Sequence, residues 1–147
     1  MSCTFATQKN SGGAFFKPGD HSADLALMIE PKNVLENQRN EYQGDVTFRD
    51  VVVADITVFR NSQNIETQSP FEVIRDGKID KTALVSEARE HVGTGVPMLV
   101  TVGKKPGKNY YVFNFDVPAD RVTAVAGYYT NREAALAEAT ANAPSFD

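Results

Sequence analysis

The sequence predicts a single, mainly β domain with a few helices. Its 147 residues, of which 41% are hydrophobic and 23% charged, suit one globular core and exclude wholesale disorder. Residues Val46–Phe59 form the clearest strand pattern, and within Val51–Phe59 apolar residues recur at every second position, which is the period of a half-buried strand. A helical period follows in Leu84, Val85, Ala88 and Val92.

The N-terminal part predicts a loop and one strand. Residues 1–13, rich in Ser, Gly, Asn and Thr, indicate a flexible segment. The apolar run Asp24–Ile29 predicts a buried strand that Pro31 stops, because proline donates no backbone hydrogen bond. Residues 32–44 are polar and rich in amides, so we expect an exposed excursion there.

Alternation in the central strand assigns its two faces. The face expected to lie in the core is uniformly apolar and comprises Val52, Ala54, Ile56 and Val58. The other face mixes apolar, acidic and hydroxyl groups, as a half-exposed sheet face does, and comprises Val51, Val53, Asp55, Thr57 and Phe59.

Beyond the central strand, residues 60–70 predict a polar loop that could include a weak strand. A short apolar segment, Phe71–Ile74, follows, and Asp76-Gly77 is typical of a turn. The helical period predicts a helix over Asp80–Val92, and Asp80 is expected to cap its N-terminus.

The last elements predict a hairpin and two helices. Met98–Val102 and Tyr110–Val117 are apolar runs joined by a glycine-bearing, basic loop. Helices are expected over 118–129 and, after a break at Thr130 or Asn131, over 132–141.

A small five-stranded barrel with a helix between its third and fourth strands is the OB-fold arrangement. We therefore predict an OB-fold-like domain over residues 14–130, followed by a C-terminal helix and short tail over 131–147. A mixed α+β sheet domain has the same inventory of elements.

Composition excludes several classes of protein. Fifteen Lys and Arg against 19 Asp and Glu leave a net charge of −4, which argues against a surface that binds polyanions everywhere but permits a local basic groove. One cysteine and two histidines, without CxxC or HxxxH spacing, predict no disulfide and no metal site. A reducing cytoplasm is the expected setting. No secretory leader and no membrane span are expected, because the apolar runs are too short.

The densest positive charge lies in the loop between the last two strands. Lys104, Lys105 and Lys108 could neutralise phosphates, and Tyr110 could offer its ring to an unpaired base. Alternation along this strand places Tyr111, Phe113 and Phe115 on one face, which is expected to lie in the core. Tyr110 lies on the other face and is therefore the better candidate for stacking on a base. Lysines that merely solubilise a hairpin tip are the competing interpretation.

Two further places pair an aromatic ring with a guanidinium. Phe59 and Arg60 close the central strand, with Thr57 on the face of Phe59, and Phe48 precedes Arg49. Both could contact nucleic acid, but either ring could equally close the end of the barrel core.

No spacing indicates catalysis. The sequence has no phosphate-binding glycine loop, no nucleophile elbow and no carboxylate pair with a mechanistic spacing. We therefore expect no enzyme activity and no cofactor.

Three stretches carry a resemblance to a known family: Phe15-Phe16-Lys17-Pro18-Gly19-Asp20, Asp24–Pro31 and Val53–Phe59. Together with Pro97–Lys105 and Asp116–Asp120, they resemble OB-fold single-stranded DNA-binding proteins of tailed phages, notably those infecting actinobacteria. The likeness spans roughly residues 14–130 and is a pattern of strands and turns.

The resemblance implies sequence-tolerant binding of single-stranded DNA in phage DNA replication, recombination or repair, in the host cytoplasm and without catalysis. It implies a binding face that includes Arg49, Thr57, Phe59, Arg60 and the 104–110 loop. Members of this group often end in a strongly acidic tail that recruits partners. Here Phe146-Asp147 follows an alanine-rich segment, so recruitment of phage or host replication proteins through the tail is not expected.

The alternative is a structural or protein-interaction module of a phage that does not touch nucleic acid, which the acidic balance would suit. A homodimer paired through the strand Val51–Phe59 is compatible with either function.

Overall fold

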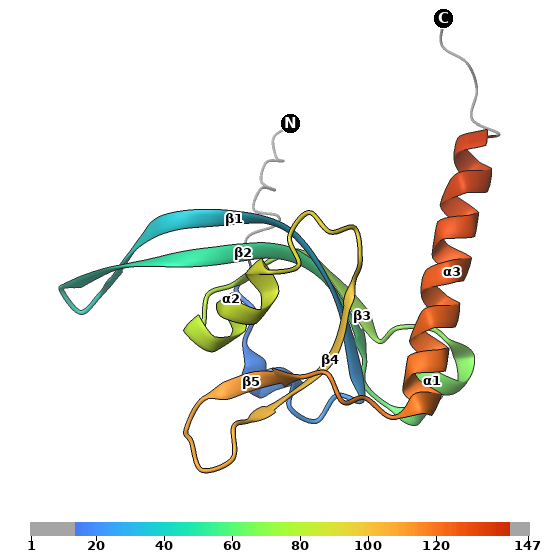
Figure 1. Ribbon diagram of the computed structural model, residues 1–147, viewed down its shortest axis with the longest axis horizontal. Coiled ribbons are helices and arrows are strands. Elements are labelled where there is room, and N and C mark those ends of the chain that lie inside the picture. Colours follow the sequence, from blue (N-terminus) through green and yellow to red (C-terminus); the bar gives the residue numbers. More distant parts are fainter. Residues whose placement is uncertain (1–13, 142–147) are drawn as a thin grey trace, which may run out of the picture.

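The computed structural model describes residues 14–141 (Figure 1). In chain order, its elements are the 3-10 turn η2 (Pro18–His21), β1 (Ala26–Tyr42), β2 (Asp45–Phe59), α1 (Ser62–Thr67), β3 (Glu72–Ile79), α2 (Thr82–Arg89), β4 (Met98–Lys104), β5 (Tyr111–Asn114) and α3 (Ala119–Ala141). The prediction of a flexible segment over 1–13 lies outside the described residues. The chain is mainly β, as predicted.

The strands form one antiparallel sheet in the order β3-β2-β1-β4-β5. The sheet curls into a half-barrel, and α2 lies beside its concave side (Figure 1). Because β2 lies between β3 and β1, both of its edges are already paired over Val52–Val58. The predicted pairing of two copies through this strand is therefore wrong.

The N-terminal segment lies along the outer edge of β3. The backbone N–H of Phe16 donates to the Lys78 carbonyl at 2.7 Å, and the Lys78 N–H donates to the Ala14 carbonyl at 2.8 Å. The Phe16 ring is buried, and its centroid lies 6.3 Å from that of Phe113 on β5. The segment thus links β3 and β5, the two end strands of the sheet.

Side chains are buried on both faces of the sheet. The predicted core positions Val52, Ala54, Ile56 and Val58 are all fully buried in the inner cluster, which confirms the predicted face. A second cluster of Ala26, Met28, Phe59 and Val125 lies on the opposite face. Because α3 contributes to it, that face is more buried than the predicted half-exposed one.

The excursion predicted for residues 32–44 is instead strand. β1 continues through Pro31 with a register shift before Asn33, and with β2 it forms an arm that projects from the body (Figure 1). β4 pairs β1 only over Leu27–Ile29, so Pro31 lies where one edge of β1 has no partner strand. Proline is tolerated at such an edge because no ladder hydrogen bond is lost.

Helix boundaries also differ from the predictions. Residues 60–70, expected to be a loop, include α1. At the N-terminus of this helix, the side chains of Asn61 and Asn64 each accept a hydrogen bond from the other residue's backbone N–H. α2 begins after Lys81, and the Asp80 carboxylate pairs with Arg49 instead of capping the helix. The two helices predicted after residue 118 are the single helix α3, which runs without a break through Thr130 and Asn131. Among residues 14–141, no helix is long and apolar enough to cross a membrane.

Truncation of a core leucine should lower the free energy of unfolding far more than truncation of a surface leucine. Leu27 is fully buried, so Leu27→Ala should lower the free energy of unfolding by about 2–5 kcal/mol through lost transfer energy and a residual cavity. The matched control Leu136→Ala, at a position 56% exposed on α3, should change it by less than about 0.5 kcal/mol. Urea denaturation of both variants measures the difference, and equal losses would contradict the described packing.

Candidate nucleic-acid interface

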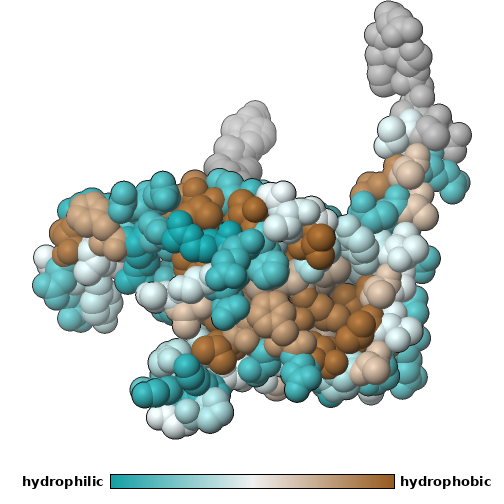
Figure 2. Space-filling model, viewed as in Figure 1, coloured by the Kyte–Doolittle hydropathy of each residue, from teal (hydrophilic) through white to brown (hydrophobic). Residues whose placement is uncertain are grey.

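The basic loop predicted between the last two strands projects from the body (Figure 1) and is hydrophilic (Figure 2). The Lys105 N–H donates to the Tyr110 carbonyl at 3.0 Å, and the Lys108 N–H donates to the Lys105 carbonyl at 2.9 Å. Gly107 has a φ of +75°, a conformation that glycine adopts without strain. These contacts close the turn and leave the ammonium groups of its lysines exposed.

A groove of about 710 Å³ lies beside this loop. Three chain segments line it: Lys17, Pro18 and Gly19 before and within η2; Lys81, Thr82 and Ala83 at the start of α2; and Asn109, Tyr110 and Tyr111 at the start of β5. Its volume is in the range of small-ligand sites. The groove joins the predicted loop to two segments distant in sequence.

The two tyrosines of the groove have different surroundings. Tyr110 is 43% exposed, whereas Tyr111 is half-buried and packs against the inner core. This agrees with the predicted alternation for Tyr110 and Tyr111, whereas Phe115, expected on the core side with Tyr111, is 47% exposed. A Cβ placed on Gly19 would lie 3.5 Å from the Tyr111 hydroxyl, so η2 packs closely against this ring.

Cations in the described residues fall into two groups. Every arginine in residues 14–141 engages an acceptor of the protein: Arg39 with Glu41, Arg49 with Asp80, Arg60 with Asp24, Arg75 with Asp55, Arg89 with Asp50, Arg121 with the Leu25 carbonyl and Arg132 with Glu30. Lys32 is likewise paired with Asp55 and Asp76.

The remaining lysines in that part of the chain have no carboxylate oxygen within 4.0 Å: Lys17, Lys78, Lys81, Lys104, Lys105 and Lys108. Lys17 and Lys81 line the groove, and the last three belong to the adjoining loop. Lys78 lies 5.5 Å from the Phe15 ring centroid. Five of these six lysines therefore belong to the groove or to the loop that contains Tyr110, although the whole chain has a net charge of −4.

Two predicted arginines, Arg49 and Arg60, are not part of the lining of this groove. Arg49 donates to Asp80 at 3.2 Å. Arg60 donates to the buried Asp24 at 2.7 Å, and this hydrogen bond is the main reason why the pKa of Arg60 is raised. Their guanidinium groups already hold carboxylates of the protein, so the structure does not bring them together with the lysine loop.

The prediction that Phe59 presents its ring to a base is wrong. Phe59 and Thr57 are both fully buried, and the Phe59 ring packs edge-on against Tyr128 of α3 at 5.5 Å between centroids. Neither side chain offers surface to a ligand, because the face that carries them is covered. Phe48, by contrast, is 64% exposed, on the β1–β2 arm.

Sequence reasoning missed Lys17 and Lys81 as members of the site. Lys17 follows the aromatic pair Phe15-Phe16, and this neighbourhood is a weak signal by itself. Lys81 directly precedes α2 and carries no signal in the sequence, since an exposed lysine there is ordinary. Only the folded chain brings both beside Tyr110.

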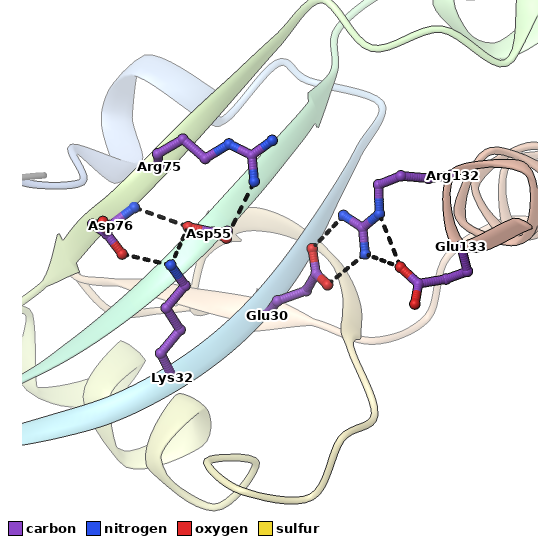
Figure 3. Close-up of polar contacts among 7 residues, drawn as sticks. All are labelled: Glu30, Lys32, Asp55, Arg75, Asp76, Arg132 and Glu133. Carbon is purple, nitrogen blue, oxygen red and sulfur yellow. Dashed lines mark hydrogen bonds and ion pairs between the residues drawn. The ribbon is translucent and has the colours of Figure 1, made fainter. Parts of the chain in front are cut away.

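Elsewhere, charges cancel within compact networks (Figure 3). Arg132 of α3 donates through two nitrogens to both carboxylate oxygens of Glu30 on β1, at 2.8 and 2.7 Å, and also contacts Glu133. The Glu30 hydrogen bonds are the main cause of the raised pKa of Arg132. This bidentate contact ties α3 to the sheet.

Asp55 is the centre of the second network. Its carboxylate accepts from the Asp76 backbone N–H at 2.9 Å and pairs with Lys32 at 3.0 Å and Arg75 at 3.5 Å. Burial acts to raise the pKa of Asp55, but the hydrogen bonds and the neighbouring cations outweigh burial and lower it. The Asp76 hydrogen bond is the main cause of the raised pKa of Lys32. The network thus links β1, β2 and β3 to one another and has a structural role.

Comparison with known protein families, with curated proteins and with solved structures finds no match to this chain. Within residues 14–141, no group of three or more His, Cys, Asp or Glu side chains could hold a metal ion. The chemistry of the groove is that of exposed ammonium groups around an accessible aromatic ring, which suits a polyanion with flat, apolar parts.

Asp55 should make stability depend on pH. A pKa lowered by folding means that the ionised carboxylate contributes stability above its unfolded value of about 3.9, and that this contribution is lost as pH falls through the folded value. Asp55→Asn should therefore lower the free energy of unfolding by on the order of 1–3 kcal/mol at pH 7. The deficit relative to the parent should shrink at pH 3, as measured by urea denaturation.

The matched control is Glu87→Gln, at an exposed position of α2. It should leave stability unchanged within about 0.5 kcal/mol at both pH values. A deficit of Asp55→Asn that is the same at pH 7 and pH 3 would contradict the role given to the Asp55 charge.

Proposed function

We propose that this protein binds single-stranded DNA with little sequence preference and that it acts without catalysis. The observation that carries the proposal is the gathering of lysines without carboxylate partners around the groove and the ring of Tyr110. Ammonium groups neutralise phosphates, and an accessible ring stacks on any base, because every base has a π face.

The arrangement of strands supports the proposal. β1 pairs with both β2 and β4, and α2 follows β3 and precedes β4, as in an OB-fold barrel. Such barrels bind oligonucleotides on a strand face and on the loop between their last two strands. Here that loop is the 104–110 segment. Phage DNA replication, recombination or repair is the setting that the sequence resemblance suggests.

Weak sequence preference follows from the kind of cation present. Arginine can read base edges with its two-pronged guanidinium, but six of the seven arginines in residues 14–141 are held by carboxylates and Arg121 by a backbone carbonyl. The cations that line the groove are lysines, which act as point charges. Affinity should therefore come from phosphates and stacking rather than from base edges.

The test is a titration of fluorescent oligothymidine at several salt concentrations, together with duplex DNA and RNA of equal length. We expect binding of the single strand that weakens as salt rises, by about 0.7 logarithmic units per phosphate contact for each decade of salt. Absence of binding, or affinity independent of salt, would reject the proposal.

Replacing the loop lysines tests which residues carry the charge. The triple variant Lys104→Gln, Lys105→Gln and Lys108→Gln should weaken binding and lower the salt slope by up to about 2, since each lost phosphate contact contributes about 0.7. The matched triple variant with arginine at the same positions keeps the charge and should retain the slope. Equal slopes for the parent and the glutamine variant would show that the loop does not contact phosphates.

The β1–β2 arm supports a second candidate, a protein-interaction module. Apolar side chains are exposed at the end of the arm (Figure 2): Tyr42 is 69%, Val46 43% and Phe48 64% exposed. Exposed apolar groups of this kind often mark protein contacts. A protein that fails to bind any nucleic acid in the titration above would favour this candidate.

A further inference from the structure

The groove differs from the basic loop because its lining is mainly apolar and comes from three separate segments of the chain. The buried Pro18 forms one part of the lining, and Tyr110 and Tyr111 form another part. Gly19 has no side chain, and a Cβ at this position would lie 3.5 Å from the Tyr111 hydroxyl. A flat, apolar group can enter such a site, whereas a hydrated phosphate would gain little from its walls.

The cations of the groove come from two different segments. Lys17 directly precedes η2 and Lys81 directly precedes α2, and both belong to the lining. Neither has a carboxylate partner among the described residues, in contrast to Lys32 on β1. Their ammonium groups are therefore available to anionic groups of a ligand in the groove.

Asn109 completes the rim. Its side-chain oxygen accepts from the Lys104 ammonium at 3.5 Å, and Lys104 in turn lies 5.7 Å from the Tyr111 ring centroid. These contacts connect the loop to the groove, so that a chain of phosphates leaving the groove at this side meets the loop lysines next.

We propose that the groove seats one unstacked nucleobase of the bound strand against Tyr110 and that Lys17 and Lys81 hold the phosphates flanking it. The inference rests on the proposed function. It adds Lys17 and Lys81 to the binding residues and gives a reason why single strands are bound in preference to duplexes. A base in a duplex is stacked and paired, so it cannot enter the groove without being extruded. Single strands are favoured because their bases are already free.

The experiment compares two ligands of about 16 nucleotides, oligothymidine and an abasic oligodeoxyribose phosphate of equal length, by fluorescence anisotropy. The abasic strand keeps the phosphates and lacks the bases. The protein variants are Tyr110→Ala, Tyr110→Phe, the double variant Lys17→Gln with Lys81→Gln, and its charge-retaining counterpart Lys17→Arg with Lys81→Arg. Circular dichroism checks that each variant is folded.

Tyr110→Ala should weaken binding of oligothymidine by roughly 5- to 150-fold and leave binding of the abasic strand unchanged, because only the first ligand loses a stacked base. Tyr110→Phe should retain the parent affinity. The glutamine double variant should weaken binding of both ligands and lower the salt slope by about 1.4, for two phosphate contacts. The arginine double variant should keep the parent slope.

Failure of this inference and failure of the proposed function give different results. If the parent binds oligothymidine in a salt-dependent way but the glutamine double variant has the parent affinity and slope, the groove lysines do not hold phosphates and the inference is overturned. Equal losses of Tyr110→Ala on both ligands would also overturn it, because no base would then be seated. No binding by the parent protein would reject the proposed function itself.

Discussion

The pairing of residues 14–16 with the outer edge of β3 is the constraint on which the candidate site depends. Two backbone hydrogen bonds with Lys78 and the burial of Phe16 against Phe113 hold the N-terminal segment between β3 and β5. Because Lys17 and η2 follow directly, this pairing carries them to the start of β5. Without it, the groove would lose the wall that Lys17, Pro18 and Gly19 form.

The positive charge that the surface presents depends on which cations lack a carboxylate partner rather than on the total number of cations. The net charge is −4, yet Lys32 and six of the seven arginines in residues 14–141 pair with carboxylates of the protein, while the lysines near the groove do not. Field strength near a surface depends on local, unpaired charges, since distant ones are screened within about 10 Å at ordinary salt. An acidic protein can therefore present a positive surface over one loop and one groove.

Burial of both faces of the sheet explains why one predicted contact is wrong. Alternation along β2 separated its faces well, and the inner one is in the core as predicted. The outer face is covered by α3, which Arg132 attaches to Glu30 and which packs Tyr128 on Phe59. Neither contact can be read from the strand itself, because their partners lie far along the chain. Tyr110, which directly precedes β5 and lines the groove, is 43% exposed.

The sequence by itself determined the mainly β class, the buried face of the central strand, the final hairpin and its lysine loop, because periodicity and turn composition are local properties. It did not determine that β1 continues beyond Pro31. A strand tolerates proline where one of its edges has no partner, and only the folded structure shows that β4 ends its pairing with β1 at Ile29. It also left open which cations are free and which rings are covered. Those outcomes depend on contacts such as Arg132 with Glu30, between residues distant in sequence, and only the tertiary structure brings such groups together.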